Sequence, residues 1–408
     1  MYLRGYSMKR TYTGTRVACY IGYFVQAIIN CLSPVLFIVY QTELSLSYSQ
    51  LSMLVLVNFL TQLCVDLLSA RYVDRIGYRR AITLAHILAA AGLILLAVLP
   101  RRMGNAFAGL LIPTVVYAFG SGLIEVLISP IVDSLPSDSK SAGMSLLHSF
   151  YCWGQLAVVL ITTLLLRVIG TANWVVIPLL WAVVPVVNLF NFLTVPLVPP
   201  VAEEKKTPLC RLLHSGFFLA AMLLMLTAGA AEQAMSQWAS LFAETSLHVS
   251  KVVGDILGPC LFAALMGSAR LFYGLMGAKI QLRKALTVSA ALCVAAYLLA
   301  ALAPWPIVSL LGCGLCGLSV GLMWPGVFSL TSAQYAAGGT TMFAVLAVFG
   351  DLGCAFGPGL TGEVSAAAEA ANSRLSGLSC GLLAALVFPI LMLVLLRMQK
   401  RSEKSVSN

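Results

Sequence analysis

Four carboxylates lie inside long apolar stretches of the chain, an unusual place for an ionised side chain. They are Asp66, Glu125, Glu232 and Asp351. A charge at the centre of a bilayer costs at least about 2.5 to 3.5 kcal/mol, so such an acid should face an aqueous cavity or carry a proton. An acid withdrawn from water favours its neutral form, and it can therefore load and release a proton. Glu125, Glu232 and Asp351 are the predicted proton-coupling groups, and no Lys or Arg is expected at their depth.

Glu125 belongs to a polar stripe on a predicted helix. At steps of four residues, Glu125 is preceded by Tyr117 and Ser121 and followed by Ser129. Such steps place side chains on one face of a helix. We expect this face to line a cavity, with Tyr117 and Ser121 contacting a bound solute.

Glu232 stands at the start of a second polar run. Gln233, Ser236, Gln237 and Trp238 follow it, and together they offer enough hydrogen-bonding groups to bind a polar solute. Gln233, Gln237 and Trp238 are predicted contacts.

Asp351, in contrast, has small or apolar neighbours. Gly350, Gly353 and Gly357 lie close to it, and a row of small residues predicts that its helix packs closely against another helix.

Two further predicted helices carry polar faces, and aromatic rings accompany them. Tyr151 and Gln155 share a helix face with His148, because they follow it at offsets of three and seven residues. Tyr23, Gln26 and Asn30 form a broad stripe on the first apolar segment. Large rings within apolar segments can also stack on the apolar face of a sugar. These predicted solute-binding residues are Tyr23, Gln26, Asn30, His148, Tyr151, Gln155, Trp238 and Trp324.

A charged loop follows the second apolar segment and has the composition of a conformational gate. Gly77 permits a tight turn, while Asp74 can cap a helix end or pair with a basic side chain. Asp66 lies only eight residues before Asp74 and is assigned to the same gate. The predicted gating residues are Asp66, Arg71, Asp74, Arg75, Gly77, Arg79, Arg80 and Arg270.

The elements that position these residues must be membrane-spanning helices. Of the 408 residues, 60% are hydrophobic and only 10% are charged, whereas a soluble domain carries about 25% charged residues. A membrane helix needs about 20 apolar residues, so twelve helices would use about 240, close to the number available. Phosphate-binding (P-loop) and His-Glu-x-x-His metalloprotease patterns are absent from the sequence, which argues against ATP-driven pumping and metal-dependent hydrolysis.

Apolar segments separated by breakers predict an all-α membrane protein with twelve spans. A polar, proline-containing segment at 199–210 divides it into two predicted six-helix bundles, 1–198 and 211–408. The predicted spans lie near 17–40, 48–70, 80–99, 106–131, 141–168, 174–197, 212–243, 251–277, 284–303, 306–333, 338–362 and 375–397.

The basic residues predict the orientation of these spans. With the N-terminus in the cytoplasm, inner segments hold 20 of the 25 Lys and Arg residues and outer segments hold 5. This bias places both termini and the 199–210 segment in the cytoplasm. We expect a multi-pass protein of the plasma (inner) membrane.

The two predicted bundles resemble each other. Gly122-Leu123 stands eight residues before Pro130, and Gly317-Leu318 stands eight residues before Pro325. Ser69-Ala70-Arg71 recurs as Ser268-Ala269-Arg270. Two repeats of six helices resemble the major facilitator superfamily, and the charged loop is similar to its signature Gly-x-x-x-Asp-Arg-x-Gly. The resemblance implies a solute site between the bundles near the midplane.

Within that superfamily the chain resembles the fucose:proton symporter branch. Gly122, Glu125 and Pro130 match its fourth span, which maps its essential carboxylate onto Glu125. Glu232 with Trp238 is similar to its seventh span, and Trp324-Pro325 to its tenth. The polar pair of its fifth span is changed to His148 and Tyr151, and the acid of its first span is missing around Asn30. The resemblance thus implies proton coupling and a solute other than fucose.

These features predict a secondary active transporter that imports a small polar solute, such as a sugar, with protons by alternating access. A proton-driven exporter of cationic or lipophilic compounds and a transporter-like receptor that binds without translocating remain alternatives. The expected lack of intramembrane Lys and Arg argues against an anionic solute. We expect a monomer in the lipid bilayer that has no enzymatic activity, binds no nucleic acid, and uses neither a metal nor another cofactor.

Overall fold

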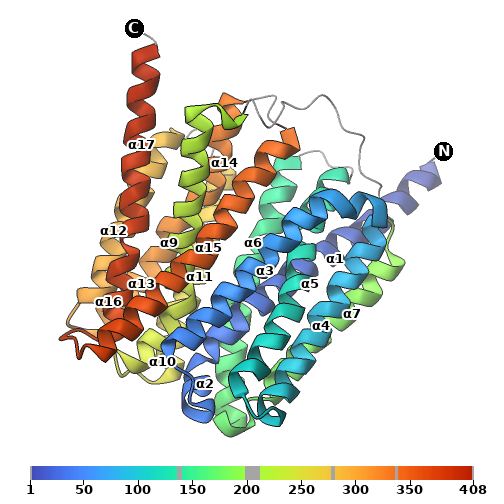
Figure 1. Ribbon diagram of the computed structural model, residues 1–408. Coiled ribbons are helices and arrows are strands. Elements are labelled where there is room, and N and C mark those ends of the chain that lie inside the picture. Colours follow the sequence, from blue (N-terminus) through green and yellow to red (C-terminus); the bar gives the residue numbers. More distant parts are fainter. Residues whose placement is uncertain (1, 136–139, 198–211, 277–280, 336–338, 407–408) are drawn as a thin grey trace. The chain divides into compact units, whose positions relative to one another are not determined.

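The computed structural model describes residues 2–135, 140–197, 212–276, 281–335 and 339–406. Within these ranges the chain is helical apart from short turns (Figure 1). Twelve segments are long and apolar enough to cross a membrane, which confirms the predicted number. A bilayer core offers no water to the backbone, so a helix, which satisfies its own N–H and C=O groups, suits each apolar segment. The predicted linker at 199–210 lies outside the described residues.

The chain divides into two compact units, and the first contains Met1–Leu46 and Leu60–Ala202. Helix α3 contributes its second part to this unit. The helices of unit 1 are α1 (Tyr2–Val35), α2 (Phe37–Leu44), α3 (Tyr48–Ile76, from Leu60), α4 (Tyr78–Arg102), α5 (Ala106–Ser134), α6 (Lys140–Ile169), the short 3-10 helix η1 (Thr171–Asn173) and α7 (Val176–Thr194).

Unit 2 contains Ser47–Phe59 and Glu203–Asn408. The first part of α3 therefore belongs to the same unit as the second half of the chain. The predicted division into six-helix bundles at 1–198 and 211–408 stays a proposal. The other helices of unit 2 are α9 (Gly216–Thr245), α10 (Lys251–Asp255), the π-helical turn η2 (Ile256–Cys260), α11 (Leu261–Met276), α12 (Leu282–Leu302), α13 (Pro306–Val320), α14 (Met323–Gln334), α15 (Gly339–Ala370), α16 (Gly377–Ala385) and α17 (Val387–Val406).

In unit 1, α4 packs along α5 and α7, and α1 packs against α5, α6 and α7. The turn between α3 and α4 is a single residue, Gly77, with a φ of +87°. A side chain is rarely tolerated at such a φ. The tight turn predicted at Gly77 is therefore confirmed.

In unit 2, α9 and α15 run side by side (Figure 1). A Cβ atom on Gly229 would collide with the Gly350 carbonyl oxygen, and one on Gly353 would collide with the Leu226 carbonyl oxygen. Only glycine lets the two backbones approach this closely. The predicted close packing of the helix that carries Asp351 is confirmed, and α9 with its Glu232 is its partner.

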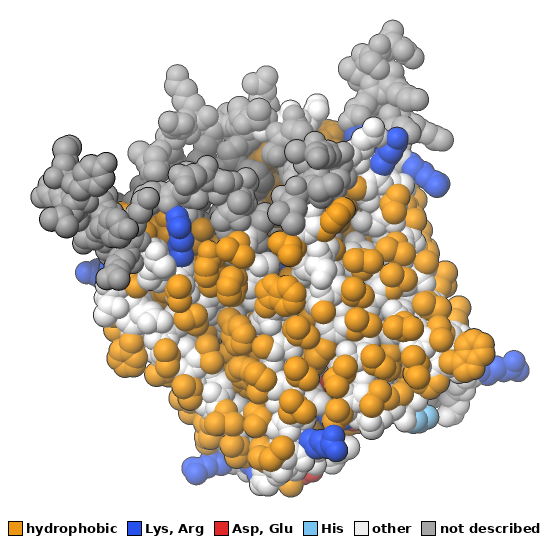
Figure 2. Space-filling view, turned by 180° about the vertical axis from the view of Figure 1, so that it is seen from behind, with side chains coloured by type: hydrophobic (Ala, Val, Ile, Leu, Met, Phe, Trp, Pro, Cys, Tyr) orange, Lys and Arg blue, Asp and Glu red, His pale blue; other side chains and the backbone are white. Residues whose placement is uncertain are grey.

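The outer faces of the helices are apolar. Figure 2 shows a face on which hydrophobic side chains predominate. Large apolar side chains are exposed on the helices, as Phe190 at 62% and Val288 at 65% illustrate. Polar side chains lie instead inside the units, among them Gln26, Asn30 and Gln237. This arrangement suits lipid as the solvent.

Candidate functional site

The first polar group in unit 1 joins α1 to α5. Gln26 Nε2 donates a hydrogen bond of 2.6 Å to Glu125 Oε2. Gln26 is buried and Glu125 is half-buried. An amide N–H can donate to an ionised carboxylate and to the carbonyl oxygen of a neutral carboxyl group. Gln26 can therefore hold Glu125 in both protonation states.

A second polar group links three helices through Gln62 of α3. Gln62 Nε2 donates to Asn30 Oδ1 of α1 at 3.0 Å, and Ser121 Oγ of α5 donates to Gln62 Oε1 at 2.9 Å. The predicted residues Asn30 and Ser121 thus both form hydrogen bonds with the Gln62 side-chain amide. Gln62 was not predicted as a site residue, although an amide one turn before Asp66 in an apolar segment was a usable signal.

Tyr117 of α5 forms the third group. Its hydroxyl lies 3.2 Å from Ser33 Oγ and 3.0 Å from Thr114 Oγ1. The residue is only 2% exposed. In this structure Tyr117 holds α5 against α1, and its predicted contact with a solute stays a prediction.

Helix α6 brings its predicted face close to α1. The rings of Tyr23 and His148 meet edge to face with centroids 5.1 Å apart. His148 is exposed, Tyr151 is half-buried and Gln155 is buried. Tyr23 and His148, which were predicted on separate helices, are therefore in contact.

In unit 2, Glu232 of α9 forms an ion pair with Arg270 of α11. The distance from Arg270 Nη2 to Glu232 Oε2 is 3.0 Å. The expectation that no basic residue lies at the depth of the acids is wrong here. Arg270 belongs to the eighth candidate span, and its long aliphatic stem carries the guanidinium group to a partner 38 residues away in sequence.

Two amides extend this pair along α9. Gln233 Nε2 lies 3.5 Å from Glu232 Oε1, and Gln237 Nε2 donates to Gln233 Oε1 at 2.8 Å. Trp238 is fully buried, and its indole N–H donates to the Pro358 carbonyl at 3.0 Å. In this structure Trp238 packs between helices, and its predicted stacking on a solute stays a prediction.

Trp324 and Asp351 lie near the close approach of α9 and α15. The indole ring of Trp324 on α14 covers Gly350, where an added Cβ atom would meet it. Phe328 lies beside Trp324, with ring centroids 6.2 Å apart. Asp351 follows Gly350 in α15 and is 5% exposed.

The predicted gating residues are described only in part. Arg71, Asp74 and Arg75 belong to α3, but their side chains lie outside the described residues. Asp66 is half-buried, Arg80 is exposed, and Arg270 pairs with Glu232 as described above.

Arg79 has a clear structural partner in unit 1. Its guanidinium donates to the carbonyls of Phe192, Leu193 and Val195 at 2.7 to 2.8 Å. These carbonyls belong to the last turn of α7 and its C-cap, where orphaned acceptors need donors. Arg79 therefore holds the start of α4 to the end of α7.

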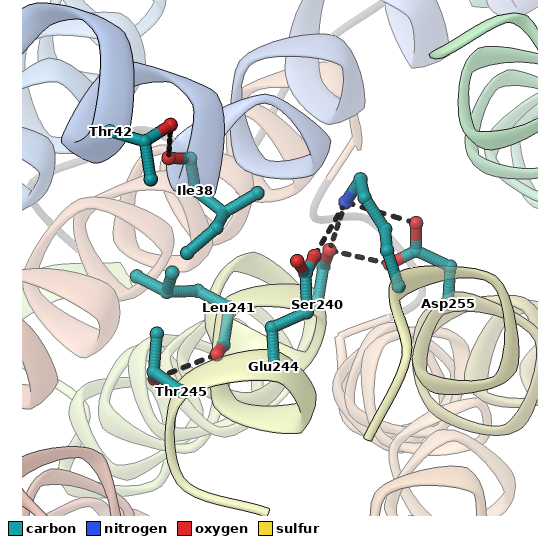
Figure 3. A network of polar contacts seen from close by, with 8 residues as sticks. Ile38, Thr42, Ser240, Leu241, Glu244, Thr245 and Asp255 are labelled. Carbon is teal, nitrogen blue, oxygen red and sulfur yellow. Dashed lines mark hydrogen bonds and ion pairs between the residues drawn. The ribbon is translucent and has the colours of Figure 1, made fainter. Parts of the chain in front are cut away.

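A charged cluster that sequence reasoning missed lies where α9 ends and α10 begins. Lys251 Nζ lies 2.9 Å from Glu244 Oε1, 3.1 Å from Asp255 Oδ2 and 3.1 Å from Ser240 Oγ. Ser240 Oγ also donates to Asp255 Oδ1 at 2.5 Å. Figure 3 shows Ser240, Glu244 and Asp255 pointing toward one another. The usable signal was Asp255 itself, a fifth acid inside an apolar segment.

The described part of the chain has no group of three or more His, Cys, Asp or Glu side chains that could hold a metal ion. The polar groups above can bind a solute through hydrogen bonds and can exchange protons.

Comparison with known proteins identifies the family. The family model of the Major Facilitator Superfamily matches residues 19–358. The chain belongs to the Major Facilitator Superfamily. Its twelve-helix fold is that of a multi-pass membrane transporter of this superfamily, as the resemblance in the sequence implied. No curated protein matches the chain.

Solved structures of the superfamily share this fold at low sequence identity. The E. coli fucose:proton symporter is 15% identical, with a TM-score of 0.65 over 94% of this chain and 98% of that one. A D-xylose-proton symporter is 15% identical, with a TM-score of 0.73 over 95% and 97%. A bacterial homolog of the human lysosomal transporter Spinster, captured inward-facing and occupied, is 15% identical, with a TM-score of 0.73 over 96% and 97%.

Proposed function

We propose that this protein is a secondary active transporter that imports a small polar solute, such as a sugar, together with protons by alternating access. The observation that carries the proposal is Glu125, a carboxylate in a membrane-spanning helix that accepts a hydrogen bond from the neutral Gln26 amide. A carboxyl group inside a membrane-spanning helix changes its own charge when it binds or releases a proton. A carrier needs such a group to couple solute movement to a proton gradient.

The polar side chains inside unit 1 support a hydrophilic solute. Amides and hydroxyls from α1, α3 and α5 form connected hydrogen bonds around Gln62 and around Tyr117. Donors and acceptors of this kind recognise hydroxyl groups, which offer both functions in return. We include Glu232 and Asp351 as further proton-coupling candidates. The remaining proposed contacts are Tyr23, Gln26, Asn30, Tyr117, Ser121, His148, Tyr151, Gln155, Gln233, Gln237, Trp238 and Trp324.

The membrane, orientation and assembly are part of the same proposal. We place the protein in the plasma membrane as a monomer. Its termini are cytoplasmic in this proposal, because the basic residues are concentrated in the segments that would then face inward. The gate is formed by the end of α3 and the Gly77 turn that follows it. There Asp74 and its basic neighbours bias the exchange between inward-open and outward-open states.

The experiment combines a ligand screen with flux measurements. Purified protein is screened for thermal stabilisation by sugars, sugar acids, nucleosides, amino acids and cationic drugs, and each hit is tested for uptake into proteoliposomes with and without a pH gradient. Solute accumulation that follows the proton gradient supports the proposal. Export of cationic compounds, or binding with no flux under any gradient, contradicts it and favours an exporter or a receptor.

The role of Glu125 is tested by Glu125→Gln. The substitution imitates the protonated acid and keeps a group to which Gln26 can donate, so the variant should bind solute and exchange it across the membrane. Accumulation driven by a pH gradient should be lost, while the exposed Glu43→Gln should accumulate solute like the unmodified protein. Solute binding should also weaken with rising pH in the unmodified protein and not in Glu125→Gln. Full gradient-driven uptake by Glu125→Gln would assign the proton to another acid.

A further inference from the structure

Three hydroxyl groups inside unit 1 form a chain whose direction follows from counting hydrogens. Thr114 Oγ1 donates to the Leu110 carbonyl at 2.8 Å, which uses its single hydrogen. The Tyr117 hydroxyl, 3.0 Å away, must therefore donate to Thr114 Oγ1. Ser33 Oγ, 3.2 Å from the Tyr117 hydroxyl, must in turn donate to Tyr117. The chain thus ends at Ser33 Oγ, which can still accept a hydrogen bond and has no hydrogen left to donate.

Two buried donors lie beside this end of the chain. They are the hydroxyl of Tyr40 on α2 and the indole N–H of Trp174, directly after η1, and both side chains are fully buried. Their rings meet edge to face, with centroids 5.3 Å apart. Ser33 and Tyr117 lie close enough to act on the Tyr40 hydroxyl electrostatically. None of the described residues, however, forms a hydrogen bond with the Tyr40 hydroxyl or with Trp174 Nε1.

The chemistry of these three groups defines the partner that they require. A buried polar group gives up its hydrogen bonds to solvent, and this loss destabilises the fold unless a new partner replaces them. The partner must accept from two donors, Tyr40 and Trp174, and donate to one acceptor, Ser33. A cation cannot accept and a halide cannot donate. Water does both, because its oxygen accepts two hydrogen bonds and donates two.

We propose that a single buried water molecule binds among Ser33, Tyr40 and Trp174. It accepts from the Tyr40 hydroxyl and the Trp174 indole N–H and donates to Ser33 Oγ. This water site is independent of the transported solute and of the direction of transport.

The bound water connects the two sides of a break in the first span. Helix α1 ends at Val35 and α2 begins at Phe37, so Ser33 lies before the break and Tyr40 after it. Trp174 adds the segment between α6 and α7. Through the hydrogen bond between Ser33 and Tyr117 the same water is linked to α5. The water therefore ties α2 to the rest of unit 1 where the backbone helix is interrupted.

X-ray-generated hydroxyl radicals test this site in the unmodified, purified protein. Radicals formed from a bound water oxidise the side chains that contact it, even where bulk solvent does not reach. Tyr40 and Trp174 should be oxidised several times faster than buried rings that have protein partners. The matched references are Tyr297, whose hydroxyl donates to a backbone carbonyl at 2.7 Å, and Trp181, whose indole N–H donates to a threonine hydroxyl at 2.9 Å.

The sign of the stability change in Tyr40→Phe gives a second, independent test. A hydroxyl bonded to water stabilises the protein, so its removal should lower the unfolding temperature by about 1 to 2 °C. Removal of an unpaired buried hydroxyl would instead raise the unfolding temperature. The double variant of Tyr40→Phe with Ser33→Ala should lose less than the sum of the single losses, because both substitutions remove contacts to one water. Tyr297→Phe, in unit 2, should add fully to Ser33→Ala.

The proposal requires all of these results. It is wrong if Tyr40 or Trp174 is oxidised no faster than its reference, or if Tyr40→Phe raises the unfolding temperature. Full additivity of Tyr40→Phe and Ser33→Ala would also contradict a shared water. Should Tyr40→Phe not fold, radical oxidation of the unmodified protein decides alone. None of these measurements involves transport, so their failure would leave the proposed function unaffected.

Discussion

At the scale of single residues, Glu125 and Glu232 are chemically identical and differ in their partners. Glu125 accepts from the neutral Gln26 amide, whereas Glu232 pairs with the Arg270 guanidinium. A proton on Glu125 changes the carboxyl group that the Gln26 amide contacts, whereas a proton on Glu232 weakens its ion pair with Arg270. We therefore expect the two acids to respond differently to protonation.

A residue-scale prediction concerns the Lys251 cluster. Lys251→Met leaves Glu244 and the 1% exposed Asp255 side by side without their cation, so we expect the protein to lose about 3 to 5 kcal/mol of stability. Thermal unfolding in detergent measures the loss. The exposed Lys284→Met is the matched control. Adding Asp255→Asn to Lys251→Met should recover part of the loss, and no recovery would mean that Lys251 acts mainly through its packing.

At the scale of elements, the position of Glu232 depends on how closely α9 and α15 approach. Gly229 and Gly353 remove the side chains that would separate the two backbones. The small-residue contact places α9, with its acid and amides, at a defined depth beside the helix that carries Asp351.

An element-scale prediction follows for Gly353→Ala. The new Cβ atom would collide with the Leu226 carbonyl oxygen and lie 2.8 Å from Ala230 N, so α9 and α15 must move apart. We expect a loss of about 1 to 3 kcal/mol, as for other overpacked positions. Gly216→Ala on α9 meets no atom within 4 Å and should be close to neutral. Equal unfolding temperatures for the two variants would contradict this account of the contact.

At the scale of the whole molecule, twelve spans and the distribution of basic residues predict cytoplasmic termini and a cytoplasmic central segment. A fluorescent reporter fused after Asn408, or inserted at 199–208, should be active in the cytoplasm. Activity of a periplasmic reporter at either point would overturn this topology.

Asp74→Asn should slow transport more than it weakens solute binding, because the gate changes the rate of conformational exchange. Equal losses of transport and binding would indicate misfolding or a direct role of Asp74 in binding.

The sequence by itself determined the number of spans, the tight turn at Gly77 and the close packing of the helix around Asp351. These features depend on local properties: the length of an apolar segment relative to the bilayer, the φ that glycine permits and a row of small residues. Only the tertiary structure decided that Arg270 reaches Glu232 and that Gln62 joins Asn30 to Ser121. Such contacts join side chains of different helices, and the helix rotation and side-chain reach that bring them together are set by packing, which apolar periodicity does not encode.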